Sequence, residues 1–388
     1  MPGISDTIIN LARMRATLDN TAAHFPGSRQ AASREAARLI ETTEFGSNPG
    51  ALRMLSYVPD GLAAGAPLVV VLHGCTQSAA SYDHGSGWSQ LAARHGFALL
   101  FPEQQRGNNA NLCFNWFQSA DVSRTGGEAE SIQQMIRLLV REHRIDPARV
   151  YVTGLSAGGA MTASLLACFP EVFAGGAIIA GLPHGAAVSI PTAFEAMSSG
   201  KSRPAAEWGD LVREAAPYRG PRPAVQIWQG TADTTVRPSN ATELVKQWSN
   251  VHGVTVTPDI TDLQDGARHE MWRGPEGRIV LETYLVPGMA HGTPLDTGDD
   301  DLDHSVGHTG PHMLAADIGS TWHIARSWGL LTHASQSRRS YVNNQEMGAV
   351  DDGRLAAGRV PDAPALPSIG AKAVIEKALR AAGLMGHS

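Results

Sequence analysis

The segment VYVTGLSAGGAMTASLLACFP, Val150 to Pro170, carries the strongest indication of the fold. It opens with an apolar, β-branched run that is typical of a buried strand, and it ends as a small-residue segment that favours a helix. Between them lies TGLSAG, in which Ser156 stands between Gly154 and Gly158. Glycine is needed where a side chain would clash or where φ is positive, so this spacing predicts a sharp turn. The sequence therefore predicts a strand, a tight turn that carries Ser156, and a helix.

Similar apolar runs recur along the chain and alternate with helical patterns. LVVVLHG (68–74) and FALLFPEQ (97–104) are continuous runs of the kind that is buried on both faces of a parallel sheet. FAGGAIIAG, AVQIWQG and RIVLETYLV supply further strands. Strands that alternate with helices predict an α/β fold, with a mostly parallel central sheet and helices on both faces.

The same pattern predicts how the chain is organised. We expect residues 44–335 to form the α/β domain, with a small cap insertion at about 187–223, where the strand pattern weakens. Residues 1–43 are predicted to form an N-terminal helical segment that includes Leu39 and Ile40. Residues 336–388 are predicted to form a linker and a short C-terminal helix. Thr125 and Glu128 have the spacing of a capping box, which predicts a helix start there.

The G-x-S-x-G pattern around Ser156 is that of the nucleophile elbow of α/β-hydrolases. A serine hydroxyl is a weak nucleophile and needs a histidine base, which in turn needs a carboxylate to orient it. In such hydrolases the three follow in the order serine, acid, histidine, on loops after strands. Asp233 directly follows the AVQIWQG strand, and His291 follows the last strand. We therefore predict Ser156, Asp233 and His291 as a catalytic triad.

Rival residues exist for two of these roles. His304, His308 and His312 are alternative bases, and Asp259, Asp262 and Asp265 are alternative acids, but none of the six follows a strand in the same manner. The segment LHGCTQ follows a buried strand where hydrolases of this kind keep an oxyanion turn. We expect the backbone N–H groups of Cys75 and Ala157 to form the oxyanion hole, because preorganised donors there stabilise the developing charge.

Several longer segments resemble one family. LVVVLHGCTQ, GFALLFPEQ, NLCFNWF, GTADTTV and the string from Arg144 to Gly185 are similar to poly(3-hydroxybutyrate) depolymerase-family esterases, which are related to feruloyl and acetylxylan esterases. The resemblance runs from about Leu52 to Leu331. It implies the same triad, ester hydrolysis by a hydrolase without metal or organic cofactor, and a substrate-facing Trp116. Trp228, beside the acid loop, is a second expected substrate contact.

Composition restricts the partners of the chain. Among 388 residues, 43% are hydrophobic and the net charge is −6, and no basic stripe indicates nucleic acid. No stretch approaches the roughly 20 apolar residues of a membrane span, so no membrane partner is expected. A homo-oligomer stays open. The N-terminal segment lacks the pattern of a secretory signal, which makes a cytoplasmic location the expectation.

The three cysteines qualify that expectation. Cys75 and Cys113 lie on segments that should converge near the active site, so a disulfide and two free thiols are both open. A disulfide would argue for export, since cytoplasmic thiols are kept reduced. Cys168, on the apolar helix after the turn, is expected to be an inert core residue.

Other interpretations of the sequence remain open at this stage. The acid- and histidine-rich segment 296–312 allows a calcium or zinc site, but its glycines and proline favour a solvated loop, and we predict no metal. The favoured substrate is a poly- or oligo-3-hydroxybutyrate ester. The alternatives are feruloyl or acetyl esters of plant polysaccharide and, more remotely, a hydrolase-like binding protein without catalysis.

Overall fold

The structure is a computed structural model that describes residues 39–298 and 304–331. Its strands are β1 (Ile40–Thr42), β2 (Arg53–Tyr57), β3 (Leu68–Leu72), β4 (Ala98–Glu103), β5 (Val150–Leu155), β6 (Gly175–Ile179), β7 (Ala224–Gly230), β8 (Ile260–Gln264), β9 (Ala267–Arg273), β10 (Ile279–Val286), β11 (Thr293–Leu295) and β12 (Met313–Ala315). Its helices are α3 (Ala79–Ser86), α4 (Trp88–His95), α5 (Gly127–His143), α6 (Ala157–Cys168), α7 (Ile190–Ser199), α8 (Ala205–Ala215), α9 (Ser239–His252) and α10 (Ser320–Ser327).

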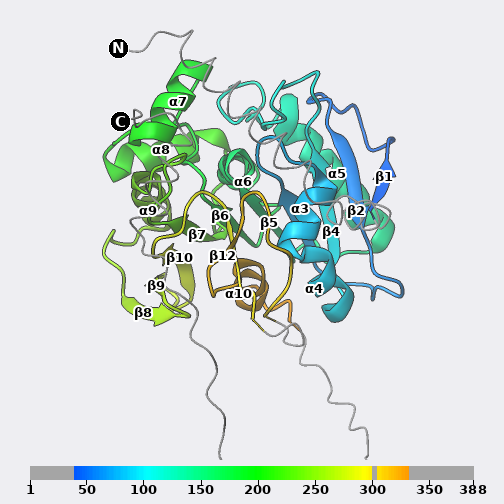
Figure 1. Ribbon diagram of the computed structural model, residues 1–388. Coiled ribbons are helices and arrows are strands. Elements are labelled where there is room, and N and C mark those ends of the chain that lie inside the picture. The colour runs from blue at the N-terminus through cyan, green and yellow to red at the C-terminus, as the bar shows by residue number, and fades with distance from the viewer. Residues whose placement is uncertain (1–38, 299–303, 332–388) are drawn as a thin grey trace, which may run out of the picture. The chain divides into compact units, whose positions relative to one another are not determined.

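Ten strands form one sheet in the order β1-β2-β4-β3-β5-β6-β7-β10-β9-β8. The six central strands, β4, β3, β5, β6, β7 and β10, pair in parallel with their neighbours. Antiparallel pairing adds β2 and β1 at one edge and β9 and β8 at the other (Figure 1). The parallel strands end at a common edge, because Leu72 pairs with Gly154 and Val286 pairs with Gly230. The prediction of a mostly parallel sheet is confirmed.

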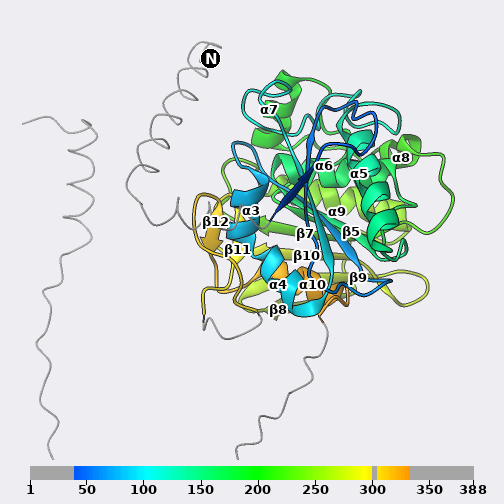
Figure 2. The ribbon, with the colours of Figure 1, turned by 90° about the vertical axis from the view of Figure 1, so that its right-hand side faces the viewer.

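Two apolar layers cover the sheet. In β3, Leu68, Val70 and Leu72 belong to one buried cluster, while Val69 and Val71 belong to the other, as the alternation of a strand requires. Helices α5, α6, α8 and α9 supply the first cluster, and α3, α4 and α10 supply the second. On the second face Trp88, the first residue of α4, stacks on Trp328, which directly follows α10 (Figure 2). Helices therefore cover both faces, as predicted.

The prediction of a helical segment over residues 1–43 is wrong at its C-terminal end. Ile40–Thr42 form β1, which pairs antiparallel with β2 through Ile40 and Ser56. An ion pair between Glu41 and Arg53 joins the two strands, at 2.6 Å. Pairing across strands thus overrides the weak helical pattern around Leu39 and Ile40. Residues 1–38 and the predicted linker and helix at 336–388 lie outside the described residues.

The predicted insertion at 187–223 folds into α7 and α8. Helix α8 belongs to the covering layer, because Val212 packs in the first core cluster. Helix α7 packs through Ala193 and Ala196 in a third, smaller cluster that also contains Ala157, beside the Ser156 turn. In both views α7 lies at the top of the sheet (Figures 1 and 2). The insertion therefore supplies one covering helix and one helix near the predicted nucleophile.

The predicted capping box of Thr125 and Glu128 is wrong. Helix α5 begins at Gly127, its N-cap residue is Gly126, and no side chain caps it. The carboxylate of Glu128 instead accepts hydrogen bonds from Gln104 and Asn115. The sequence spacing cannot reveal this, because the donors come from a loop that is distant along the chain.

A half-buried histidine makes the stability of the fold depend on pH. His184 follows β6, its backbone N–H donates to Gln247 at 3.0 Å, and its Nδ1 lies 3.1 Å from the Ser164 hydroxyl. Burial lowers the pKa of His184 from 6.5 to about 4. Below pH 6.5 the unfolded chain binds a proton that the folded chain does not, so acidification favours unfolding until the pH reaches about 4. We expect the free energy of unfolding to fall over this window.

Denaturant titrations at pH 7 and pH 4.5 measure this effect, and His184→Gln should make the pH dependence shallower. His252 has a pKa that burial lowers to about 4 as well, so part of the slope should remain in the variant. A slope that is identical in the variant and the original protein would contradict the assignment to His184.

Candidate active site

Ser156 stands at the turn between β5 and α6, in a strained backbone conformation. Its φ is 59° and its ψ is −116°, a region that residues other than glycine seldom adopt. The turn is fixed by a hydrogen bond of 2.9 Å from the Ser156 backbone N–H to the Ile179 carbonyl at the end of β6. Such strain is typical of functional sites, because the surrounding structure must hold it in place. The predicted turn is confirmed.

The flanking glycines allow backbones to pass closely. A Cβ at Gly154 would lie 2.5 Å from the Gly158 carbonyl, and a Cβ at Gly158 would lie 2.5 Å from the Leu72 carbonyl oxygen and 2.6 Å from that of His73. Any larger residue at Gly158 would therefore push the start of α6 away from the end of β3. This close approach places the predicted oxyanion turn, which follows Leu72, against the helix that begins at Ala157.

Asp233 and His291 meet at the same edge of the sheet. The His291 ring Nδ1 lies 2.7 Å from Asp233 Oδ2. The Asp233 loop and the His291 loop are also joined through the backbone, because Ala232 N–H donates to the Met289 carbonyl at 3.0 Å. The parallel pairing of β7 and β10 brings these loops together, although they are far apart in sequence.

The environment of Asp233 favours its charged form. Burial by itself would raise the pKa of Asp233, but the hydrogen bond and the charge of His291, together with backbone N–H groups of Val236 and Thr235, lower it below its usual value. Gln229 donates a further hydrogen bond to Oδ2, at 3.1 Å. A buried carboxylate that stays ionised beside an imidazole can orient the ring and stabilise a positive charge on it.

The rival residues have other partners. Asp262 pairs with His269 and Asp265 with His323, each at 2.9 Å, while Asp259 accepts from the Arg273 backbone. His304 pairs with Asp296, and His308 stacks on His84. His312 lies beside the predicted base, with its Nδ1 at 3.2 Å from the His291 carbonyl oxygen. Of the acids and histidines considered, Asp233 and His291 are the pair joined at the Ser156 edge of the sheet.

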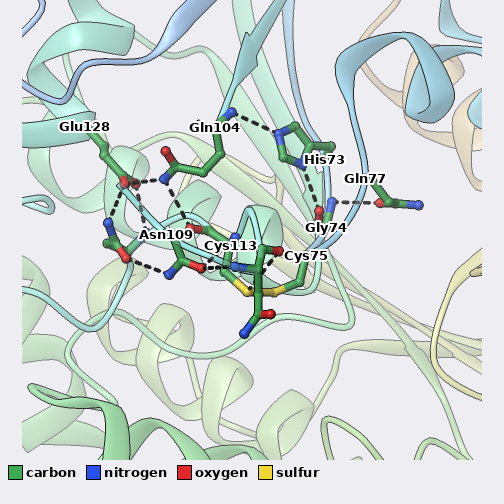
Figure 3. The surroundings of a disulfide bond; sticks show 10 residues. His73, Gly74, Cys75, Gln77, Gln104, Asn109, Cys113 and Glu128 are labelled. Carbon is green, nitrogen blue, oxygen red and sulfur yellow. Dashed lines mark hydrogen bonds between the residues drawn. A yellow bond between two sulfur atoms is a disulfide. The ribbon is translucent and has the colours of Figure 1, made fainter. Parts of the chain in front are cut away.

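A disulfide joins Cys75 to Cys113 (Figure 3). Both residues pack against the cluster that contains Ala157 and Trp116. Because Cys75 lies in the predicted oxyanion turn and Cys113 lies in the loop before Trp116, the bond links these two segments. Cys168 is the free, buried cysteine expected from the sequence, and burial raises its pKa to about 12.

Reducing the disulfide should destabilise the protein. The two cysteines are 38 residues apart, and closing a loop of that length removes chain entropy from the unfolded state worth about 4 kcal/mol. We expect the free energy of unfolding to fall by up to this amount when the bond is reduced. Urea titrations with and without dithiothreitol measure the difference, with Cys168→Ala as the control that keeps the bond. Identical urea midpoints in both conditions would contradict the assignment.

The two predicted substrate tryptophans lie in different environments. Trp116 is 6% exposed and belongs to the cluster beside Ala157, so its role stays a prediction. Trp228 is wrongly assigned, because it is fully buried and stacks on Tyr284 at 3.9 Å between ring centroids. Its position beside the acid loop in sequence does not reveal that its ring points into the core.

A cluster of metal ligands and a membrane-spanning helix are both absent from the part of the chain that the structure describes. Within 39–298 and 304–331 no group of three or more His, Cys, Asp or Glu side chains could hold a metal ion. No helix in this part of the chain has the length and apolar character needed to cross a bilayer.

A mostly parallel sheet, covered by helices on both faces, with a strained serine after β5 and an acid–histidine pair after β7 and β10, defines the α/β-hydrolase class. A solved acetyl xylan esterase from Aspergillus awamori has this fold. It matches with a TM-score of 0.60 and 28% identity, over 65% of this chain and 93% of that one.

Sequence comparison identifies the family within this class. The family model described as "Esterase PHB depolymerase" matches residues 52–268. Poly(3-hydroxyalkanoate) depolymerase C of Paucimonas lemoignei is 46% identical, over 76% of this chain and 70% of its own length. Feruloyl esterase B of Neurospora crassa is 35% identical (69% of this chain, 92% of that one), and acetylxylan esterase A of Aspergillus oryzae is 33% identical (69% and 88%). The chain belongs to the PHB depolymerase family of esterases and is a carboxylic-ester hydrolase.

Proposed function

We propose that the protein is a serine esterase that works through a Ser156–His291–Asp233 triad. The observation that carries this proposal is the 2.7 Å contact between His291 and Asp233 at the sheet edge where the Ser156 turn lies. A family of esterases that shares the fold supports the same chemistry. Each of the three residues follows a parallel strand, and the carboxyl ends of these strands meet at one edge of the sheet. All three side chains can therefore reach an ester bound at that edge.

The reaction follows from the roles of these groups. Ser156 attacks the ester carbonyl while His291 accepts its proton, and Asp233 holds the imidazole in the required tautomer. His291 then protonates the leaving alcohol, which gives an acyl group on Ser156. Water, activated by His291, releases the acid and restores the serine. The backbone N–H groups of Cys75 and Ala157 stabilise the oxyanion at both steps.

The proposed substrate is a 3-hydroxyalkanoate ester, as polymer or oligomer. The similarity to a poly(3-hydroxyalkanoate) depolymerase supports this class. An exposed apolar surface at α7 also supports this substrate class. There the side chains of Val188, Ile190 and Phe194 are 71%, 59% and 48% exposed. This helix is anchored beside Ala157 through Ala193 and Ala196. An aliphatic polyester offers methyl and methylene groups to such a surface, whereas a polysaccharide offers mainly hydroxyls.

A second substrate class rests on the other relatives. Feruloyl and acetylxylan esterases are identical to this chain at about a third of the aligned residues. Removal of aromatic or acetyl groups from plant polysaccharide would use the same triad. The two classes therefore differ in the groups that contact the acyl and alcohol parts and not in the chemistry.

A product assay separates the two classes. Soluble 3-hydroxybutyrate oligomers, amorphous poly(3-hydroxybutyrate) and methyl ferulate are supplied in parallel, and Ser156→Ala serves as the blank. Release of 3-hydroxybutyrate units, absent from the blank, is the expected result. Turnover of methyl ferulate alone would overturn the substrate assignment and leave the serine mechanism in place.

We also propose that the protein acts in an oxidising compartment rather than in the cytoplasm. The Cys75–Cys113 disulfide supports this proposal, because such bonds persist outside reducing compartments. Mass spectrometry of protein alkylated during extraction from its native source tests it. Alkylation of both cysteines would contradict the proposal and favour the cytoplasm.

A further inference from the structure

A buried carboxylate outside the triad lies behind the oxyanion turn. Glu128, in the first turn of α5, is fully buried. Ionisable side chains are seldom buried without hydrogen-bonding partners. Its two oxygens accept from the Gln104 side chain at 2.5 Å and from the backbone and side-chain N–H groups of Asn115 at 2.8 and 2.9 Å (Figure 3). Three donors from one loop therefore converge on this carboxylate.

The first connection from Glu128 to the oxyanion turn runs through Gln104. The Gln104 backbone N–H donates to His73 Nε2 at 3.1 Å, which leaves the proton of the neutral ring on Nδ1. His73 Nδ1 can then donate to the Gly74 carbonyl, 2.7 Å away. Burial lowers the pKa of His73, which favours this neutral form. The orientation of the peptide between Gly74 and Cys75 is thus tied to Gln104 (Figure 3).

The second connection runs through the loop that carries Cys113. Asn109 donates from its side chain to Asn115 at 2.9 Å and accepts from the Cys113 backbone at 3.3 Å. Gln104 also donates to the Cys113 carbonyl, at 3.1 Å. Cys113 is bonded to Cys75 through the disulfide. The loop that Glu128 orders therefore holds the residue whose amide we assign to the oxyanion hole.

A backbone contact completes the connection between the loop and the turn. Thr76 N–H donates to the Asn111 carbonyl at 2.7 Å, and Gly74 N–H donates to the Gln77 side chain at 2.8 Å. The peptide of Cys75 is thus flanked by fixed peptides on both sides. Its N–H direction depends on the position of the loop as well as on the end of β3.

Burial disfavours the charged form of the Glu128 carboxyl group. Burial raises its pKa to about 8, and the nearby Asp121 raises it as well, while the hydrogen bonds from Asn115 and Gln104 lower it. The Glu128 carboxyl group accepts hydrogen bonds from Gln104 and Asn115, so it is placed to act on the loop and not on the ester. A buried polar network that is fully hydrogen-bonded fixes one arrangement of its members.

We propose that Glu128 is a positioning residue of the oxyanion hole, which fixes the Cys75 amide through the Gln104 and Cys113 connections. This inference rests on the proposed function, because it needs Cys75 to be an oxyanion donor. Oxyanion donors act through their preorganised geometry, and a misplacement of about 1 Å can cost about 100-fold in rate. Glu128 thus sets the strength of transition-state binding without touching the substrate.

The test uses Glu128→Gln, in which one oxygen that accepts hydrogen bonds becomes an amide group that faces donors. We expect kcat on a soluble 3-hydroxybutyrate ester to fall by about 10- to 100-fold, with KM changed by less than about threefold, because the donor matters most in the transition state. Affinity for butylboronic acid, whose serine adduct places an oxygen in the hole, should fall in parallel with kcat. Glu128→Asp, which keeps a carboxyl group on a shorter side chain, should recover part of the loss.

Glu282→Gln is the matched control. The Glu282 carboxylate also accepts from three groups, on His269, Tyr284 and Ser327, but these lie on β9, β10 and α10. The Glu282→Gln variant should have a lower Tm, because a partly buried acceptor is lost. Its kcat and its affinity for boronic acid should stay within about twofold of the original values, because Glu282 lies away from the Ser156 turn. If Glu128→Gln lowers the Tm as the control does and leaves kcat and boronic-acid affinity unchanged, Glu128 has only a structural role and the proposal fails.

A double-mutant cycle adds an independent test. If Glu128 and the disulfide act on the same amide, the kcat losses in Glu128→Gln and Cys113→Ser should not add, since residues in one network couple. Fully additive losses would overturn the proposed connection. Retained activity in Ser156→Ala would instead overturn the proposed function, so the two failures are distinguishable.

Discussion

Ser156→Ala should lower kcat for ester hydrolysis by at least about 10⁴-fold, because loss of the nucleophile removes the acyl-enzyme route altogether. The backbone strain at position 156 comes from the turn between β5 and α6 and not from the hydroxyl, so alanine should fold there equally well. We expect substrate binding and Tm to stay close to the original values. Initial rates and thermal unfolding of the same preparation measure both.

Ser164→Ala is the control for this variant. Ser164 is a buried serine further along the same helix, and its hydroxyl contacts His184. Its removal should reduce stability and leave kcat nearly unchanged. If Ser156→Ala kept more than about a tenth of the original rate, a different nucleophile would have to act, since a true nucleophile contributes far more than that.

Asp233→Asn should lower kcat by about 10⁴-fold through the wrong tautomer of His291. Asp233 Oδ1 accepts from the backbone N–H groups of Thr235 and Val236 at 2.8 and 2.9 Å. These donors require an oxygen at that position, so the asparagine NH₂ group must face His291. The amide would then donate to His291 Nδ1, which moves the ring proton to Nε2, the atom that must accept the proton of Ser156.

Asp262→Asn is the matched control for Asp233→Asn. Asp262 also pairs with a histidine, His269, at 2.9 Å, but on the β8–β9 edge of the sheet. We expect kcat for this variant to stay within about twofold of the original, as is usual for a substitution outside the reacting groups. A comparable loss of kcat in both variants would mean that Asp233 acts through stability and not through the tautomer of His291.

Much of the fold is predictable from local patterns. LVVVL in β3 and VYVTGL in β5 form strands that are buried along their whole length, as continuous apolar runs indicate. The turn at Ser156 is also predictable, because the flanking glycines indicate that two backbone segments pass closely there. Asp233 and His291 were identifiable because each follows a strand, and parallel strands bring their carboxyl ends to one edge.

The remaining features depend on contacts that the sequence does not reveal. The ring of Trp228 stacks on Tyr284 in the core, although the loop after its strand carries Asp233. The position of Trp228 along the strand does not show whether its side chain faces the core or the active site. Glu128 matches a capping pattern, yet its partners come from the Gln104–Asn115 loop. Ile40–Thr42 form a strand because β2 offers a free edge, not because of their own propensity.

Mass spectrometry of the enzyme, acid-quenched during turnover of a 3-hydroxybutyrate ester and then mapped by peptide, tests whether Ser156 is the nucleophile. We predict that one 3-hydroxybutyryl group is found on the peptide that contains Ser156, that less of it forms in Asp233→Asn because the base for the first step is lost, and that it is absent in Ser156→Ala. An acyl group on a different residue, or turnover of the ester without any acyl-enzyme in these variants, would contradict the account.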